Sequence, residues 1–237
     1  MGVKKKKKTK TNQTQNKYLI QIKKIWNFIW HDDSFLSYVL NFALAFLFIK
    51  YLFFPGIGLV LNNDFPIVAI VSGSMEHKIS NYQICDKRSI DVRNKNINYN
   101  QWWKYCGDYY TQNYDINKTQ FKEFKYSNGL NIGDVMILYG KKPEDIKVGE
   151  VLVFIPEDKS FFEQKGPVIH RVTKKWQDEN NKYFFETKGD HNPKAFTYFE
   201  KNISQEDVIG VAVFRIPYIG YAKIILVNAF HQIINIF

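Results

Sequence analysis

The feature that most constrains this chain is an apolar run close to its amino terminus. Residues 35–54 read FLSYVLNFALAFLFIKYLFF, in which Lys50 is the single charged residue, and Pro55-Gly56 follows them. An α-helix rises about 1.5 Å per residue, so these twenty residues span about 30 Å, the thickness of the hydrocarbon core of a bilayer. We therefore predict a transmembrane helix over residues 34–55 that anchors the chain in a membrane.

The charges on either side of the run predict its orientation. Residues 1–24 hold nine lysines and no acidic residue, whereas residues 25–237 hold 24 basic and 23 acidic residues. Positive charge favours the cytoplasmic side, so we expect residues 1–34 in the cytoplasm and the chain beyond residue 60 outside it. A cleaved signal peptide is disfavoured because the run is long and no small-x-small site follows it. The nearly neutral remainder argues against a nucleic-acid-binding domain.

Three shorter segments flank or follow the anchor. Residues 1–16 are Lys, Thr, Asn and Gln with almost nothing apolar, which predicts a disordered basic tail near an anionic surface. Residues 17–33 place apolar side chains at helical spacing, which favours an interfacial amphipathic helix over a surface helix packed on the domain. Residues 222–237 are apolar but short and partly polar, so we expect an interfacial carboxyl-terminal helix there.

The chain beyond the anchor is typical of a mainly β domain. Short runs rich in Val, Ile, Phe and Tyr alternate with turn residues, and no strong helical pattern separates them. This pattern predicts one β domain built from residues 62–76 and 132–221. The predicted strands are residues 66–72, 134–140, 150–156, 166–176, 182–188 and 207–217.

Residues 77–131 interrupt the β pattern. They are polar and aromatic, with little alternation, and predict an insertion that has its own small aromatic core. Cys85 and Cys106, the two cysteines of the chain, both lie in it. Outside the cell they would form a disulfide worth about 3 kcal/mol, but two separate buried thiols are an equal alternative. Two cysteines without a histidine cluster predict no metal site.

Three short stretches carry side chains suited to nucleophilic catalysis. Ser74 lies in a Ser-Gly-Ser turn after the first predicted strand, His170 lies inside an apolar strand, and Asp190 ends another strand. A histidine is well suited to accept the proton of a serine hydroxyl near neutral pH, and a carboxylate can orient that histidine. Taken singly, each signal is weak, because the Ser-Gly-Ser stretch is more often a loop, a histidine inside a strand is more often a core residue, and an Asp at a strand end also forms an Asx-turn.

The order of these stretches is more specific than any one of them. Behind the apolar run the chain carries, in this order, SGSME (72–76), NIGDVMIL (131–138), IKVGEVLVF (146–154), PVIHRV (167–172), TKGDHNP (187–193) and VIGVAVFRIPYIG (208–220). Together these stretches resemble the type I signal peptidases of the archaeal and endoplasmic-reticulum kind, over about residues 35–76 and 131–222. The resemblance implies an antiparallel β domain of the signal-peptidase kind behind the anchor.

The resemblance also implies roles for single residues. Ser74 matches the nucleophile and His170 the general base of the Ser-His branch, while Ser72 matches a position that helps to form the oxyanion hole. Phe196 stands where family members often carry a second Asp that is taken as the third catalytic residue. We therefore expect Asp190 to orient the histidine, with Glu200 as the second choice or a Ser-His dyad as the alternative. His191 is expected to be a turn residue.

By this resemblance the chain is a membrane-bound serine endopeptidase that removes signal peptides from exported preproteins. The implied location is the cell membrane, crossed once, with the catalytic domain outside the cytoplasm. The implied partners are preprotein signal peptides, the lipid bilayer and the protein translocation machinery, and no cofactor is needed. The rivals are a membrane-anchored β domain that binds partners without catalysis and a related peptidase that processes other precursors.

Overall fold

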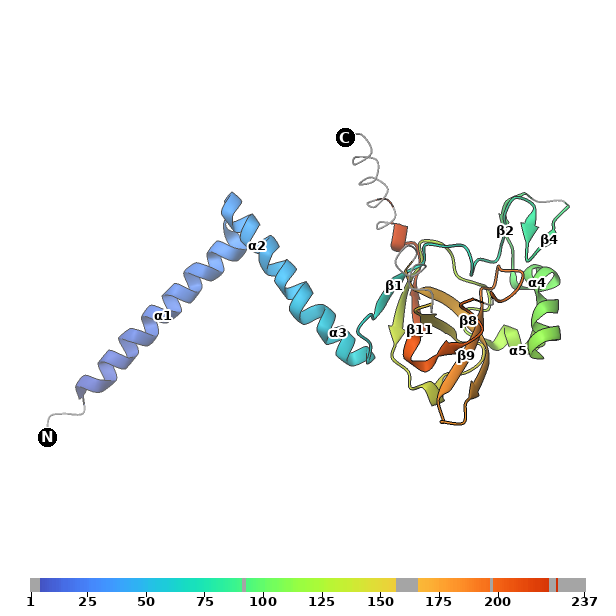
Figure 1. The fold of residues 1–237 in the computed structure, drawn as a ribbon. Coiled ribbons are helices and arrows are strands. Elements are labelled where there is room, and N and C mark those ends of the chain that lie inside the picture. The colour runs from blue at the N-terminus through green and yellow to red at the C-terminus, as the bar shows by residue number, and fades with distance from the viewer. Residues whose placement is uncertain (1–4, 91–92, 157–165, 197, 222–224, 226–237) are drawn as a thin grey trace, which may run out of the picture. The chain divides into compact units, whose positions relative to one another are not determined.

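The computed structural model describes residues 5–90, 93–156, 166–196, 198–221 and 225 (Figure 1). These residues belong to two compact units, of which the first ends at Ile57 and the second begins at Gly58. The helix expected over residues 222–237 falls, apart from Ile225, outside the described residues.

The amino-terminal unit begins with one long helix, α1, over Lys5–His31. This helix includes residues 5–16, which belong to the segment for which the sequence predicts a disordered tail. Lysine and glutamine are good helix formers, so the helix expected over residues 17–33 continues toward the amino terminus through a polar sequence. Across the bend that follows α1, the Ser37 hydroxyl donates to the Phe28 carbonyl over 2.7 Å.

The apolar run forms a continuous helix that is longer than expected. It consists of α2 (Phe35–Phe48), the π-helical turn η1 (Ile49–Phe53) and α3 (Phe54–Leu61), and it begins after Ser34, whose hydroxyl caps it. The helix has 27 residues, and an 18-residue stretch of it has a mean hydropathy of 2.1, so by length and composition it is able to cross a membrane. Pro55 lies in the first turn of α3, directly after the π-helical turn η1, and proline is tolerated in the first turn of an α-helix.

The second unit is built on a curled seven-stranded sheet in which all pairings are antiparallel (Figure 1). The predicted mainly β fold is confirmed, and β10 is the strand of this sheet that the sequence did not predict. In spatial order the strands are β1 (Ile67–Ala69), β6 (Val135–Tyr139), β11 (Val208–Ile216), β7 (Val151–Phe154), β8 (Val168–Gln177), β9 (Tyr183–Lys188) and β10 (Ile203–Ser204).

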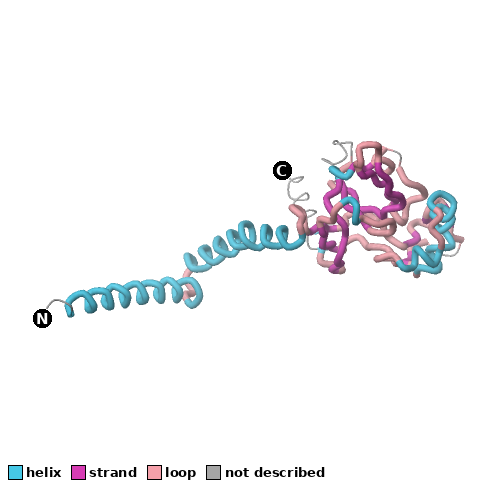
Figure 2. The backbone as a smooth tube through the Cα atoms, turned by 90° about the horizontal axis from the view of Figure 1, so that it is seen from below, coloured by secondary structure: helices cyan, strands magenta, loops and turns pink. Residues whose placement is uncertain are grey.

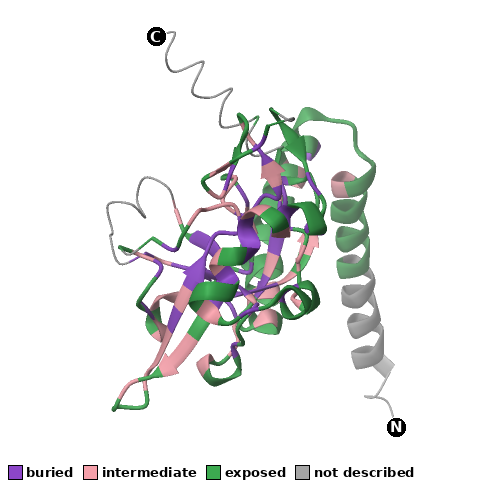
Figure 3. Ribbon diagram, turned by 90° about the vertical axis from the view of Figure 1, so that its right-hand side faces the viewer, coloured by how far each residue is buried: buried purple, intermediate pink, exposed green. Residues whose placement is uncertain are grey.

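Two apolar cores lie on the two faces of this sheet, and buried residues gather in the middle of the β unit (Figure 3). All four residues of β7 are buried. Val151 and Val153 of β7 join a core that includes Met75 and Met136. The alternate residues Leu152 and Phe154 join a second core that includes Phe185 and Val211. Register shifts in β8 and β11 mark β-bulges, which increase the twist and help the sheet to curl.

Residues between β1 and β6 form a small helical and aromatic layer at one end of the sheet (Figure 2). It contains α4 (Tyr99–Tyr114) and α5 (Lys118–Glu123), which the sequence did not predict. Each helix starts with a capping box, Asn98 with Gln101 and Asn117 with Gln120.

Short elements complete the β unit. Two small two-stranded sheets pair β2 (Lys78–Ile79) with β5 (Lys95–Asn96) and β3 (Gln83–Ile84) with β4 (Lys87–Arg88). The 3₁₀ turns η2 (Pro143–Asp145) and η3 (Gln205–Asp207) precede β7 and β11.

An aromatic core and a disulfide hold the helical layer together. Trp102, Tyr110 and Phe121 are fully buried in it. Of the two cysteine states that the sequence left open, the structure has the disulfide between Cys85 and Cys106. We call residues 77–131 the insertion, with the bounds that the sequence analysis gave to this segment.

Gly140, the residue after β6, lies in close contact with the segment at the start of the β unit. Its N–H donates to the Leu61 carbonyl over 2.9 Å, and a Cβ here would lie 1.7 Å from the Asn62 carbonyl oxygen. We predict that Gly140→Ala lowers the free energy of unfolding by about 1–3 kcal/mol because the two segments must separate. Gly56→Ala, where a Cβ meets nothing within 4 Å, is the control. Denaturant unfolding of the full chain in detergent measures both, and equal losses would contradict the prediction.

Candidate active site

Ser74 lies in a tight turn that follows β1. The turn is closed by the Glu76 N–H, which donates to the Gly73 carbonyl over 3.0 Å. The hydroxyl oxygens of Ser72 and Ser74 lie 3.2 Å apart. The two hydroxyl groups therefore lie side by side at this turn. Ser74 is half-buried, which leaves its hydroxyl accessible.

The backbone around Ser74 is held from two directions. The Ser74 carbonyl accepts the His191 N–H over 2.8 Å, and the Met75 carbonyl accepts the Leu130 N–H over 2.9 Å. The Met75 side chain is completely buried in the core of the sheet. A hydroxyl on a turn anchored in this way has a fixed position, which is what a preorganised nucleophile requires.

His170 lies on β8, opposite Leu152 of β7, and is almost completely buried. Its Nδ1 contacts the Oε1 atom of Glu200. Its Nε2 faces the turn that carries Gly189, where an added Cβ would lie 2.9 Å from Nε2 and 2.8 Å from the Ser74 carbonyl oxygen. Gly189 therefore touches both candidate residues, and its lack of a side chain lets the imidazole approach the serine turn.

One pocket joins the two candidate residues. Its volume is about 690 Å³, and Ser72, Ser74 and His170 all line it. Most of its remaining wall is apolar and comes from β1, β8 and the segment after β9. These lining residues are Val68, Ala69, Ile70, Val71, Gly166, Pro167, Val168, Ile169, Asn192, Phe196 and Phe199. The structure thus brings together Ser72, Ser74 and His170, as the sequence predicted.

Glu200, and not Asp190, is the carboxylate beside the imidazole. Glu200 is completely buried, and both its oxygens are engaged. Oε1 accepts the Gly189 N–H over 3.2 Å, and Oε2 accepts the Phe196 N–H over 2.5 Å. The expectation that Asp190 orients His170 is corrected here, and Glu200, the second choice, occupies that position.

Asp190 instead binds the neighbouring residue of β8. Arg171 donates to both its carboxylate oxygens, over 2.9 Å from Nε and 2.7 Å from Nη2. Tyr110 donates to Oδ1 over 2.9 Å, and His77 Nε2 lies 3.3 Å from Oδ2. Successive residues of a strand face opposite sides of the sheet, so His170 and Arg171 take different carboxylates.

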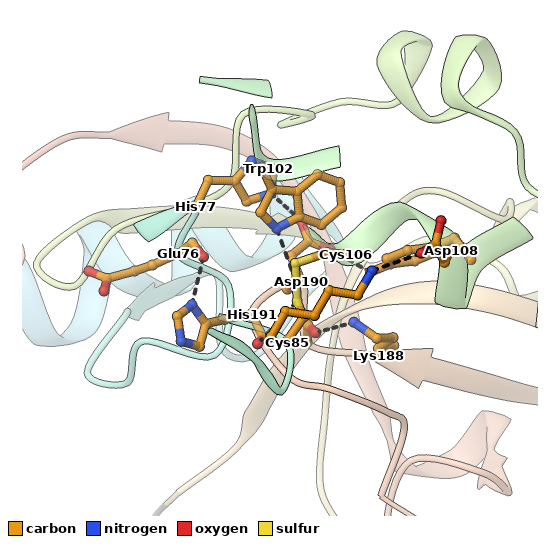
Figure 4. The surroundings of a disulfide bond; sticks show 12 residues. Glu76, His77, Cys85, Trp102, Cys106, Asp108, Lys188, Asp190 and His191 are labelled. Atoms are coloured by element: carbon orange, nitrogen blue, oxygen red, sulfur yellow. Dashed lines mark hydrogen bonds and ion pairs between the residues drawn. A yellow bond between two sulfur atoms is a disulfide. The ribbon is translucent and has the colours of Figure 1, made fainter. Parts of the chain in front are cut away.

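This network keeps Asp190 charged although it is completely buried. Burial alone would raise the pKa of Asp190, but the positive charge of Arg171 and the hydrogen bonds from His77 and Arg171 lower that pKa well below its usual value. Burial lowers the pKa of His77, which stacks on Trp102 with ring centroids 4.0 Å apart. Asp190 is therefore a structural anion at the base of the insertion (Figure 4).

Lys188 is a buried cation that sequence analysis did not single out. Its ammonium group donates to the Gly189 carbonyl over 3.0 Å and lies 4.7 Å from the centre of the Tyr110 ring. Burial lowers the pKa of Lys188 to about 8. The negative charges of Asp190 and Glu200 act in the opposite direction and raise this pKa, whereas the positive charge of Arg171 lowers it further. The sequence feature that could have pointed to Lys188 is its position in the Thr-Lys-Gly-Asp stretch, next to Gly189 and Asp190.

These features define a β domain that follows a candidate membrane-spanning helix and that brings a serine, a histidine and a glutamate together. Comparison with known proteins finds signal peptidase complex catalytic subunits. SEC11 of Eremothecium gossypii is 24% identical over 201 residues, which cover 81% of each chain. The sec11 protein of Sclerotinia sclerotiorum is 24% identical over 205 residues, 84% of this chain and 86% of its own. No family model matches the chain.

Two other relatives have a higher sequence identity to this chain, over shorter alignments. SEC11 of Zygosaccharomyces rouxii is 33% identical over 97 residues, and human SEC11C is 32% identical over 98 residues. These alignments span about half of each relative, 54% and 48% of its length. The chain is thus a homologue of the SEC11 proteins, the catalytic subunits of the signal peptidase complex, which agrees with the resemblance to signal peptidases seen in the sequence. The relatives named here are eukaryotic, so they give no support to an archaeal type.

The pKa of Lys188 predicts a pH dependence of stability. Because this pKa is lower in the folded chain, about 8, than in the unfolded chain, about 10.4, the unfolded state binds more protons between these values. The contribution of Lys188 to stability therefore rises from pH 8 to pH 10. We predict that Lys188→Met abolishes this rise, as measured by thermal unfolding of both proteins from pH 7 to 10. Parallel curves for the two proteins would contradict the prediction.

Proposed function

We propose that this chain is a membrane-bound serine endopeptidase that removes amino-terminal signal peptides from preproteins. The observation that carries the proposal is the shared pocket of Ser74 and His170, which lie far apart in the sequence. The names of the relatives support the substrate class, because SEC11 proteins are catalytic subunits of the signal peptidase complex. The same names support a partnership with other subunits of such a complex.

In the proposed reaction, the Ser74 hydroxyl attacks the carbonyl carbon at the cleavage site while His170 Nε2 takes its proton. Glu200 faces the other ring nitrogen and stabilises the imidazolium that forms. The Ser74 N–H and the Ser72 hydroxyl stabilise the oxyanion, and losing one such donor typically costs about 2.7–4 kcal/mol. The imidazolium then protonates the leaving amine, and water attacks the acyl-enzyme with His170 as the base again.

The pocket lies beside an edge strand of the sheet, to which a peptide can bind. β1 is the first strand of the sheet and contributes Val68 and Ala69 to the pocket wall. An extended peptide can add to such an edge strand through backbone hydrogen bonds, which places its side chains alternately in and out of the pocket. We infer that the preprotein binds in this way beside Ser74, with its carbonyl carbon toward the hydroxyl.

We also propose that the apolar helix Phe35–Leu61 anchors the chain in the membrane once, with the β unit outside the cytoplasm. The lysines before the helix support this orientation. In a eukaryotic cell the corresponding space is the lumen of the endoplasmic reticulum, where disulfides form, and the Cys85–Cys106 bond agrees with it. Preproteins would reach the site from the translocation machinery in the same membrane.

Substitutions in the proposed site test the reaction. We predict that Ser74→Ala and His170→Ala each reduce kcat for a synthetic preprotein at least about 10³-fold. Glu200→Gln reduces kcat about 10²–10⁴-fold, because the imidazolium loses its counter-charge, and Glu200→Asp retains part of the activity. Cleavage by the full chain, in complex with any partner subunits, is measured in detergent or liposomes.

Ser127→Ala is the matched control for Ser74→Ala, because it removes the same hydroxyl group from another half-buried serine of the β unit. Ser127 lies in the turn that follows α5 and does not line the pocket. We expect this control to cleave like the unmodified chain. Full cleavage by Ser74→Ala would refute the peptidase proposal and favour a β domain that binds partners without catalysis.

The proposed orientation has its own test in the glycosylation of asparagine. The sequence has three Asn-x-Ser/Thr sites, at Asn12, Asn117 and Asn202. Asn117 and Asn202 are exposed on the β unit, whereas Asn12 precedes the apolar helix. We predict that a eukaryotic host glycosylates Asn117 or Asn202 and leaves Asn12 unmodified.

Endoglycosidase treatment and gel mobility of the single Asn→Gln variants measure this outcome. The mobility shift should disappear in the Asn117→Gln, Asn202→Gln double variant and persist in Asn12→Gln. Glycosylation at Asn12 alone would reverse the proposed orientation. The cleavage assay above is independent of this result.

A further inference from the structure

Among its several contacts with the rest of the β unit, the insertion packs against the turn of residues 189–191. Trp102 and Tyr110 lie eight residues apart on one side of α4. The Trp102 indole N–H donates to the Asp190 carbonyl over 3.3 Å, and the Tyr110 hydroxyl donates to the Asp190 carboxylate over 2.9 Å. One helix of the insertion therefore holds both the backbone and the side chain of Asp190.

The disulfide of the insertion lies against the same turn (Figure 4). The Cys85 sulfur lies 3.5 Å from the Asp190 carbonyl oxygen and 3.4 Å from the His191 carbonyl oxygen. A disulfide sulfur has no proton to donate, so these are packing contacts. Because the bond joins Cys85 to Cys106 of α4, it fixes this sulfur beside the turn.

The other side of the turn contacts the candidate active site. The His191 N–H donates to the Ser74 carbonyl over 2.8 Å, and the Asp190 N–H points at the Met75 sulfur over 3.5 Å. Gly189 approaches both the Ser74 carbonyl and His170 Nε2. A displacement of this turn would therefore move the candidate nucleophile and the candidate base relative to each other.

We propose that the insertion is a clamp that positions the 189–191 turn, and through it Ser74 and His170, for the peptidase reaction. Trp102, Tyr110 and the Cys85–Cys106 disulfide are its positioning groups. This inference rests on the proposed function. A misplacement of about 1 Å at a reacting group can cost about 10²-fold in rate, so a small movement of the turn has a measurable effect.

Two matched pairs of variants separate this role from packing. Trp102→Phe and Tyr110→Phe keep an aromatic ring in the core and remove the donor to Asp190. Trp103→Phe and Tyr99→Phe are the controls, because both residues pack in the same aromatic core. The Tyr99 hydroxyl donates to the Lys118 carbonyl within the insertion and not to the turn.

The readouts are kcat and KM for preprotein cleavage, together with the thermal midpoint of the full chain. We expect Trp102→Phe and Tyr110→Phe each to lower kcat about tenfold or more while KM changes less than about twofold. The controls should retain kcat at an equal or greater loss of thermal midpoint. The Cys85→Ala, Cys106→Ala double variant should lower kcat in the same way.

Three outcomes would overturn the proposal. If Trp102→Phe and Tyr110→Phe keep kcat, the insertion does not position the site. If they raise KM alone, the insertion binds substrate instead. If kcat falls equally in the controls, the loss reports core packing only. Failure of the unmodified chain to cleave any preprotein would refute the proposed function, which is a distinct result.

Discussion

Two adjacent residues of β8 hold two buried carboxylates on opposite faces of the strand, and the rest of the site depends on this division. His170 contacts Glu200, and Arg171 binds Asp190. Burying ions is costly unless each has a partner, and removing one partner of a buried pair typically costs about 3–5 kcal/mol. Because successive side chains of β8 face opposite sides, Glu200 lies beside the candidate base, whereas Asp190 lies on the other side, where it binds the insertion.

The turn after β9 connects these two networks. Lys188, Gly189 and Asp190 are consecutive, yet each meets a different partner: aromatic rings of α4, the imidazole of His170, and the guanidinium of Arg171. The close approach at Gly189 leaves no room for a side chain. This turn is thus the point where the sheet, the insertion and the serine turn are coupled.

Much of the β framework could be predicted because alternating apolar residues and turn residues are local signals. Ser74 and His170 were assigned through a family resemblance, and the structure places both on one pocket. The assignment of Asp190 was wrong because a motif shows only which residues are close in the sequence. Which carboxylate contacts His170 depends on the face of β8 to which the imidazole points. Helix α4 was missed because its aromatic residues obscured the pattern, although the Asn98 and Gln101 capping pair marked its start.

The central claim is that Ser74 is the nucleophile that His170 activates. Its most direct test is to quench preprotein cleavage with acid during the first turnover and to map covalent adducts by mass spectrometry. The account predicts an acyl ester on Ser74 in the unmodified chain and none in His170→Ala. An adduct on another residue, or cleavage at the full rate by the His170→Ala variant, would contradict this claim.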